Sequence, residues 1–155
     1  MDEIQFNYFD IEHAIAVHDR IIERSGGLPG IRDQGVLESV LDHIQNDWYY
    51  PSFESKLTHL FFSVNKLHAF TDGNKRSGIF LSAFFLEING FEHCIKLFVR
   101  EMENIAVWVA DGAVSKDLLQ QIIHDLVLCE ELLESTKLEL AMAIIEHQNQ
   151  MDEGN

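Results

Sequence analysis

Apolar residues recur at helical spacing along most of this chain, and that periodicity constrains its fold more than any other feature. A first helix is predicted over Ile11 to Ile22, ending before Ser25 and two glycines. A short helix from Gly35 to about Ile44 and a longer one over Phe53 to Lys66 follow. One face of the longer helix carries Leu57, Leu60, Phe61 and Val64. No strand-type alternation persists, so the predicted class is all-α.

The apolar residues after Asn74 are too dense for a single helix face, so this segment is predicted to be a buried central helix. Asn89-Gly90 is a typical helix stop, and a further helix fits Leu97 to Ala110, ending at Asp111-Gly112. From Ser115 no glycine or proline occurs before Gly154. That length favours a break near Glu134-Ser135. We expect a single domain over residues 1–155, with a C-terminal helical extension from about residue 115.

Two irregular segments separate these helices. The stretch Gly26 to Gly35 contains four glycines and a proline and is predicted to be a loop with special backbone angles. The aromatic stretch Asn46 to Pro51 is a candidate for an extended flap.

The overall charge narrows the classes of partner. Lys and Arg total 11 against 26 Asp and Glu, so the net charge is −15. Nucleic acid phosphates and anionic membrane surfaces repel such a chain, so we expect neither as a partner. The two cysteines form no CxxC motif, and the N-terminus is acidic, unlike a signal peptide. No apolar stretch is long enough to span a bilayer. We therefore expect a cytoplasmic protein with reduced thiols.

The loop from His68 to Arg76 concentrates reactive side chains directly before the apolar helix. Lys75 and Arg76 place two cations at a helix start, where acidic residues are usually preferred. Free backbone N–H groups there, a glycine that permits close approach and these cations together predict an anion site. Asp72 is a candidate Mg²⁺ ligand and His68 a candidate general base. The spacing is not that of a P-loop.

The run HAFTDGNKRSG resembles the motif HxFx(D/E)(G/A)N(G/K)R of the Fic/Doc (Fido) family. Upstream, the segment GLPGIRDQGVLES resembles the corresponding segment of death-on-curing toxins in that family. Together these segments lie within the first two-thirds of the chain. The resemblance implies a Fido-type helical bundle in which a flap, somewhere in Gly27 to Pro51, covers the site and docks the target as an added strand.

The resemblance also implies roles for the motif residues. His68 would be the general base on a target hydroxyl, and Phe70 would anchor the loop in the core. Asp72 would bind Mg²⁺ between the phosphates of ATP. The nucleotide phosphates would be held by Gly73, Asn74, Lys75 and Arg76.

Two positions depart from the family members that transfer AMP, which usually have Gly in place of Lys75 and a second Arg in place of Ile79. At the first of these positions the chain resembles the death-on-curing toxins. That resemblance favours a kinase that transfers the ATP γ-phosphate to a Ser or Thr hydroxyl, with elongation factor Tu as the implied target and arrest of translation as the result. The alternative within the family is an AMP transferase. An antitoxin partner is also implied.

The sequence also supports other interpretations of the acidic tail and of the protein's function. Some Fido proteins are inhibited by a glutamate within (S/T)xxxE(G/N), and Glu139 and Glu153 each fit part of that pattern. The acidic tail is a solvated helix face or a partner-binding helix, with Leu132, Leu133, Leu140, Ile144 and Ile145 on its apolar side. A function of another class is a non-catalytic nucleotide-binding interaction module, although an anion holder has no need of His68.

Overall fold

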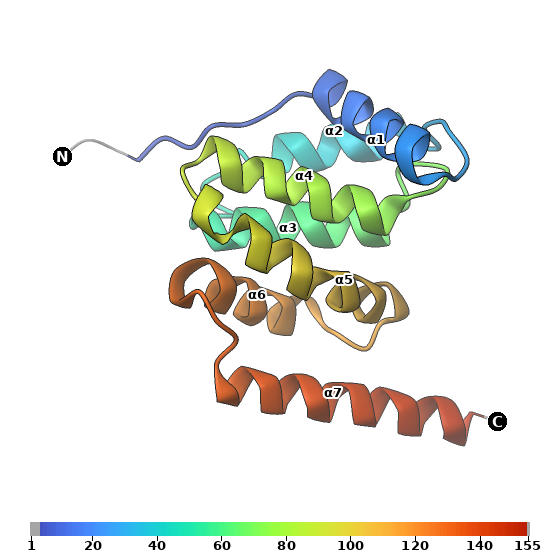
Figure 1. The fold of residues 1–155 in the computed structure, drawn as a ribbon, viewed down its shortest axis with the longest axis vertical. Coiled ribbons are helices and arrows are strands. Elements are labelled where there is room, and N and C mark those ends of the chain that lie inside the picture. The colour runs from blue at the N-terminus through green and yellow to red at the C-terminus, as the bar shows by residue number, and fades with distance from the viewer. Residues whose placement is uncertain (1–3, 155) are drawn as a thin grey trace.

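The computed structural model describes residues 4–154, which are built almost entirely from helices (Figure 1). The α-helices are α1 (Ile11–Ser25), α2 (Gln34–His43), α3 (Phe53–Lys66), α4 (Asn74–Ile88), α5 (Ile95–Asp111), α6 (Lys116–His124) and α7 (Glu134–Glu153). A 3₁₀ turn, η1 (Glu92–Cys94), precedes α5, and a π-helical turn, η2 (Asp125–Cys129), follows α6. Over residues 4–154 the only β pairing is one antiparallel bridge between Ile31 and Phe70. The predicted all-α class is confirmed.

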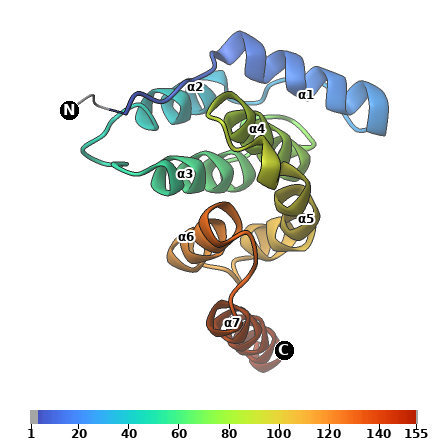
Figure 2. The same ribbon diagram turned by 60° about the vertical axis from the view of Figure 1, so that its left-hand side comes forward.

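Helices α3 and α4 pack side by side at the centre of the body. On one side α1 packs on α4 and α2 on α3, while α5 and α6 pack on the other side of the pair. Figures 1 and 2 show α7 beyond α6, farthest from α1 and α2. The apolar face predicted for α3 is fully inside, since Leu57, Leu60 and Phe61 are 0% exposed. The packed helices α3 and α4 therefore fix both ends of the loop that connects them.

Local capping chemistry sets most helix boundaries. Side chains of Asp10, Asp33, Ser52 and Ser115 accept N–H bonds at the starts of α1, α2, α3 and α6. At the end of α5, Gly112 takes the left-handed conformation that suits glycine. The predicted limits of α3 are confirmed at both ends, and the predicted break before α7 lies at residues 130–133.

One sequence-based expectation, an extended flap after α2, was wrong. Residues 46–51 form a compact turn rather than an extended flap, because Asn46 accepts backbone bonds from Trp48, Tyr49 and Tyr50. The predicted buried central helix is confirmed: most residues of α4 are buried, and the side chain of Phe80, which is 45% exposed, is an exception. The side chain of Phe80 lines an open groove between α1 and α4.

A polar cluster joins α3 to α6. His59 Nδ1 lies 2.9 Å from Lys116 Nζ, and the His59 ring stacks on Tyr50 at a centroid distance of 4.3 Å. Burial, with the nearby charge of Lys116, lowers the pKa of His59 to about 4. The folded protein therefore keeps this imidazole neutral, as an acceptor for the lysine.

A pH dependence of stability follows from His59. Between pH 6.5 and about 4 the unfolded chain binds a proton at this residue and the folded chain does not, so stability should fall as pH falls. The slope from this group approaches about 1.4 kcal/mol per pH unit. Urea unfolding of the wild type and of H59Q, measured from pH 8 to 4, checks this. Their difference in unfolding free energy should be constant above pH 7 and shrink below pH 6. A difference independent of pH would contradict the prediction.

None of the helices over residues 4–154 combines the length and apolar character needed to cross a membrane.

Candidate active site

The motif loop, residues 67–73, connects the end of α3 to the start of α4. His68 adopts the left-handed conformation, with φ of 50°, which non-glycine residues rarely take. Its ring is exposed, whereas the next two residues, Ala69 and Phe70, are buried. The backbone reversal at His68 thus leaves the imidazole in solvent while the following residues enter the core. Such strained positions persist where the surrounding structure holds them in place.

Phe70 and Asn74 hold this loop in shape. The Phe70 side chain is 0% exposed, as an anchor in the core should be. The Asn74 side chain is bonded to both main-chain groups of Phe70: its Nδ2 donates to the carbonyl at 3.0 Å, and its Oδ1 accepts from the N–H at 3.1 Å. Asn74 therefore fixes the conformation of the loop, and both polar atoms of its side-chain amide are already hydrogen-bonded within the protein.

The segment that follows α1 forms one wall of the loop. The Arg32 and Asp33 N–H groups donate to the Ala69 carbonyl at 2.8 and 2.9 Å, and the Thr71 N–H donates to the Gly30 carbonyl at 3.1 Å. These bonds form the bridge between Ile31 and Phe70. The predicted covering segment over residues 27–51 thus includes a part, residues 30–33, that pairs directly with the motif.

Asp72 faces this wall with its carboxylate. Oδ2 accepts the Leu28 N–H at 3.0 Å, and Oδ1 accepts the Gly73 N–H at 2.8 Å. These backbone bonds, chiefly the one from Leu28, lower the pKa of Asp72, so it is ionised at neutral pH. A side chain at Gly27 could not fit, because a Cβ there would lie 2.7 Å from Asp72 Oδ2. The glycine-rich segment therefore contributes one backbone donor, the Leu28 N–H, to this anionic carboxylate, and the motif loop contributes the other.

Arg76 links the motif to the end of α1. Its Nη1 donates to the Ser25 hydroxyl and, at 2.9 Å, to the Gly26 carbonyl. Carbonyls at the end of a helix lack partners within the helix, so a guanidinium is a suitable cap. Binding of a nucleotide phosphate by Arg76 stays a prediction. Arg76 would bind the phosphate through the guanidinium nitrogens other than Nη1.

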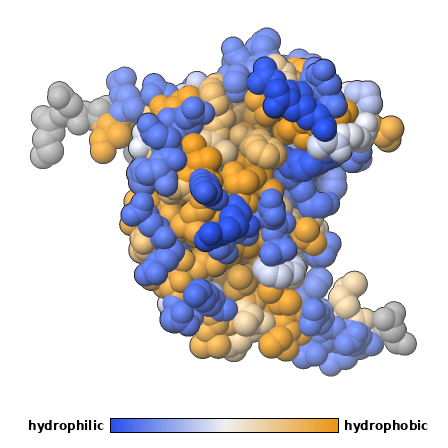
Figure 3. Space-filling model, in the orientation of Figure 1, coloured by the Kyte–Doolittle hydropathy of each residue, from blue (hydrophilic) through white to orange (hydrophobic). Residues whose placement is uncertain are grey.

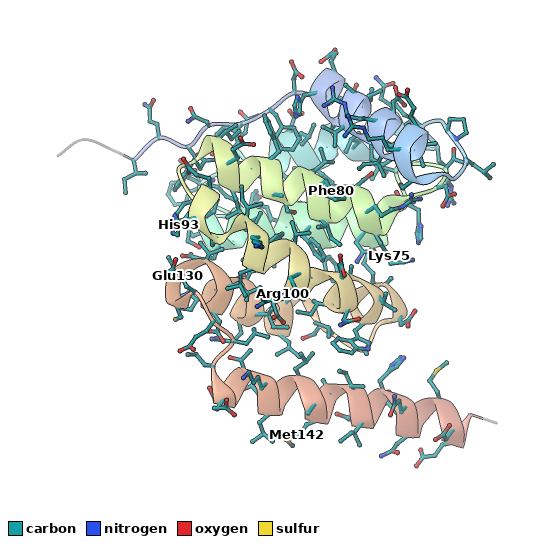
Figure 4. All side chains as sticks on the ribbon, in the orientation of Figure 1. Lys75, Phe80, His93, Arg100, Glu130 and Met142 are labelled. Carbon is teal, nitrogen blue, oxygen red and sulfur yellow. The ribbon has the colours of Figure 1, made fainter. Side chains whose placement is uncertain are left out.

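The start of α4 is open to an anion. Its N-cap is Gly73, with φ of 72° and no side-chain cap, and the first backbone bond of the helix is donated by Ser77 to the Gly73 carbonyl at 2.9 Å. Lys75 is exposed and takes part in no ion pair within residues 4–154. Figure 4 shows Lys75 at this end of α4, projecting from the helix. Backbone N–H groups, the helix dipole and an available ammonium group meet here.

One site residue was missed in the sequence. His18 on α1 is 1% exposed, and its ring stacks on Phe70 at 3.9 Å with 2° between the planes. His18 Nε2 lies 2.6 Å from the Asp72 carbonyl oxygen, which makes this nitrogen the donor. The only available sequence signal was a polar residue one turn after Ala14, on the buried face of α1. We infer that His18 positions Phe70 and Asp72.

Two substitutions separate the contributions of His18. H18F keeps an aromatic ring on Phe70 but leaves the Asp72 carbonyl without its donor, which should cost about 1–3 kcal/mol of unfolding free energy. H18A removes the stacking as well and should cost more, about 3–5 kcal/mol, a loss like that of other large-to-small core changes. Urea unfolding of both variants measures this order. Equal losses in H18F and H18A would show that the ring contact contributes nothing.

Other positions named from the sequence lie outside the loop. Ile79 is 6% exposed and packs in the core. Glu139 and Glu153 are exposed on α7, beyond α5 and α6 from the motif loop (Figure 1). Arg76 is bonded to the end of α1 and to neither glutamate. This arrangement places both glutamates away from the site.

Comparison with known proteins agrees with the fold and the motif. A sequence model of the Fic/DOC family matches residues 8–86, which include α1, the wall segment, the motif loop and most of α4. The chain belongs to the Fic/DOC family. It is similar to the protein kinase doc of Escherichia phage P1, with 34% identity over 109 residues, which cover 67% of this chain and 82% of that relative. The family resemblance and the Fido-type helical fold are thereby confirmed.

Proposed function

We propose that this protein is a kinase that transfers the γ-phosphate of ATP to a hydroxyl of a protein. The main support is one arrangement: an exposed His68, an ionised Asp72 and the uncapped start of α4 with Lys75 all lie within residues 68–75. A general base, an anion site and a carboxylate for a cation are the parts that phosphoryl transfer needs. The similarity to a protein kinase doc points the same way.

In the proposed reaction His68 accepts the proton of the target hydroxyl. The hydroxyl oxygen forms a bond to the γ-phosphorus, and the bond from that phosphorus to the bridging oxygen of ADP breaks. The ADP oxygen keeps that electron pair, so ADP leaves as the anion. The imidazole suits this step because histidine is the side chain most often used as a general base, and the His68 ring is in solvent, where a substrate can reach it.

Binding of the phosphates is assigned to the start of α4. The open N–H groups after Gly73 and the ammonium group of Lys75 can neutralise the charge that spreads over the transferring phosphoryl group. Arg76 can contribute from the side of α1 with its remaining N–H groups. Asn74 acts indirectly, because its amide holds the loop at Phe70.

Asp72 fits Mg²⁺ as a single-carboxylate site. Each of its oxygens already accepts one backbone N–H and retains a further lone pair. Within residues 4–154 no three His, Cys, Asp or Glu side chains gather to hold a metal by themselves. Mg²⁺ is commonly bound by one or two carboxylates together with substrate phosphates and water, so the ion would arrive with ATP. When bound, it neutralises phosphate charge.

The choice of the γ-phosphate over AMP rests on two side chains. Lys75 occupies a position that is usually Gly in AMP-transferring relatives, and a bulky cation there restricts how the α-phosphate could sit. Ile79 is in the core and supplies no second arginine. The proposed target is elongation factor Tu, whose modification would stop translation, and the proposed regulator is a separate antitoxin. Both proposals rest on the resemblance to death-on-curing toxins.

Isotopic labelling tests the proposal directly. The full chain is incubated with Mg²⁺, purified elongation factor Tu or bacterial lysate, and ATP labelled on either the α- or the γ-phosphate. Protein-bound label from γ-labelled ATP alone is the expected result. Label from α-labelled ATP alone would make the protein an AMP transferase. If neither label reaches protein while the chain still binds ATP, the non-catalytic binding module becomes the better description.

A further inference from the structure

Helix α7 has two apolar faces, and the body of the protein covers only one of them. The covered face consists of Thr136, Leu140, Ala143, Ile144 and His147, all buried or half-buried. Leu140 packs against the core, so this face joins α7 to the rest of the protein. Leu140 and Ile144, named from the sequence as a partner-binding face, are therefore used internally. The second face is the one available to a partner.

The uncovered face has coiled-coil spacing. Leu138, Met142 and Ile145 are 62%, 61% and 56% exposed and follow one another at intervals of four and three residues. In heptad terms they occupy positions d, a and d, and Asn149 takes the next a position. Figure 4 shows Met142 pointing away from the body, and Figure 3 shows hydrophobic atoms at the surface along the edge that α7 forms. We call this face the α7 seam.

An acidic row borders the α7 seam. Glu139, Glu146 and Glu153 are all exposed and follow one another at intervals of seven residues, so all three occupy position e. The g positions on the other border are Glu134, Ala141 and Gln148, with no basic residue. Residues at e and g select the partner of a coiled coil through their charges.

These charges disfavour a second copy of this chain. In an antiparallel pair the e rows would face each other, glutamate against glutamate. In a parallel pair Glu139 would face Glu134 of the other copy, and the remaining e residues would face Ala141 and Gln148 with no opposite charge. A membrane is disfavoured as well, because membrane-surface helices carry Lys and Arg on the polar border.

We propose that the α7 seam docks a basic amphipathic helix of another protein, with leucine or isoleucine along its own seam and Lys or Arg on its borders. Apolar side chains of that helix cover Leu138, Met142 and Ile145, and its cations face the glutamate row. Ser135 and Asn149 are the polar residues at a positions of this face, and a polar residue at position a is known to set the register of a coiled coil. Helix α7 lies beyond α5 and α6 from the motif loop, so this surface is separate from the proposed active site (Figure 1).

The test uses two fluorescently labelled peptides of four heptads, both with Ile at a and Leu at d. One carries Lys at every e and g position, and the other carries Glu. Fluorescence anisotropy with the full chain should show at least tenfold tighter binding of the lysine peptide. The triple variant E139K/E146K/E153K should reverse that preference, and L138S/I145S should bind neither peptide. These positions are exposed, so circular dichroism should show unchanged helix content.

The matched control is E23K/E92K/E103K, which changes the net charge equally at exposed positions away from α7. It should bind the lysine peptide as the wild type does. Binding that weakens equally in this control and in the α7 variant would overturn the proposal, because overall charge alone would explain it. Failure of the wild type to bind the lysine peptide would overturn it too. So would sedimentation showing a dimer that L138S/I145S converts to monomer, since the occupant would then be a second copy.

Discussion

Replacing His68 with alanine is expected to lower the rate of phosphate transfer by about 10²–10⁴-fold, the usual contribution of a general base. Binding of ATP should change little, because the phosphates are assigned to the start of α4 and not to the imidazole. The variant should also fold normally, since the His68 ring is exposed and contributes little to the core. Single-turnover transfer from γ-labelled ATP and equilibrium nucleotide binding, measured on the same preparation, separate the two effects.

The control for this substitution is H93A. His93 is also an exposed histidine, in η1 and away from the motif loop (Figure 4), so its loss should leave the transfer rate unchanged. Transfer that survives in H68A at the wild-type rate would remove His68 from the mechanism and leave the base unidentified. Loss of nucleotide binding together with transfer would instead show that the imidazole belongs to the binding site.

Replacing Phe70 with alanine should strongly lower the free energy of unfolding. The side chain is 0% exposed and stacks face to face on His18, so truncation leaves a cavity beneath the motif loop. Phe to Ala changes in cores typically cost about 3–5 kcal/mol, a large part of the roughly 5–15 kcal/mol that stabilises most domains. Urea unfolding at pH 7 measures the loss.

The matched control is F80A on α4, which removes the same group from a side chain that is 45% exposed. Because solvent already reaches that ring, its loss should cost about 1 kcal/mol or less. If F70A and F80A lowered the unfolding free energy by similar amounts, Phe70 would not be the anchor of the loop. In that case the stacking of His18 on Phe70 would also not be what holds the loop in place.

The fold was largely predictable because its signals are local. The limits of α3 follow from a Ser52 cap and an apolar face that repeats every three or four residues. The stops at Asn89-Gly90 and Gly112 follow from backbone angles that glycine takes most readily. The chemical character of residues 68–76 could also be predicted, since one short segment carries the base, the carboxylate and the cations.

Contacts between distant segments could not be predicted from such patterns. Nothing in the periodicity of α1 says that His18 bonds to the Asp72 carbonyl, that Ser25 and Gly26 receive Arg76, or that the Leu28 N–H binds Asp72, because these partners are 44 to 54 residues apart. Lys56 is a similar case: its side chain is 0% exposed and its amine is held by Asp47 and the Ile44 carbonyl. A lysine is normally expected in solvent, and burial is acceptable here only because partners from another segment satisfy the amine.

Helix α7 shows the same division. Its helical character and its break from α6 could be predicted from composition and length. Which of its two apolar faces packs inward could not, because both carry leucine or isoleucine at helical spacing. Packing against the body determines which face is buried. Leu140 lies against the core, and Leu138 is left in solvent beside the glutamate row. Local sequence thus specifies each element and the chemistry of the motif loop, while burial of one face against another specifies which side chains remain free to act.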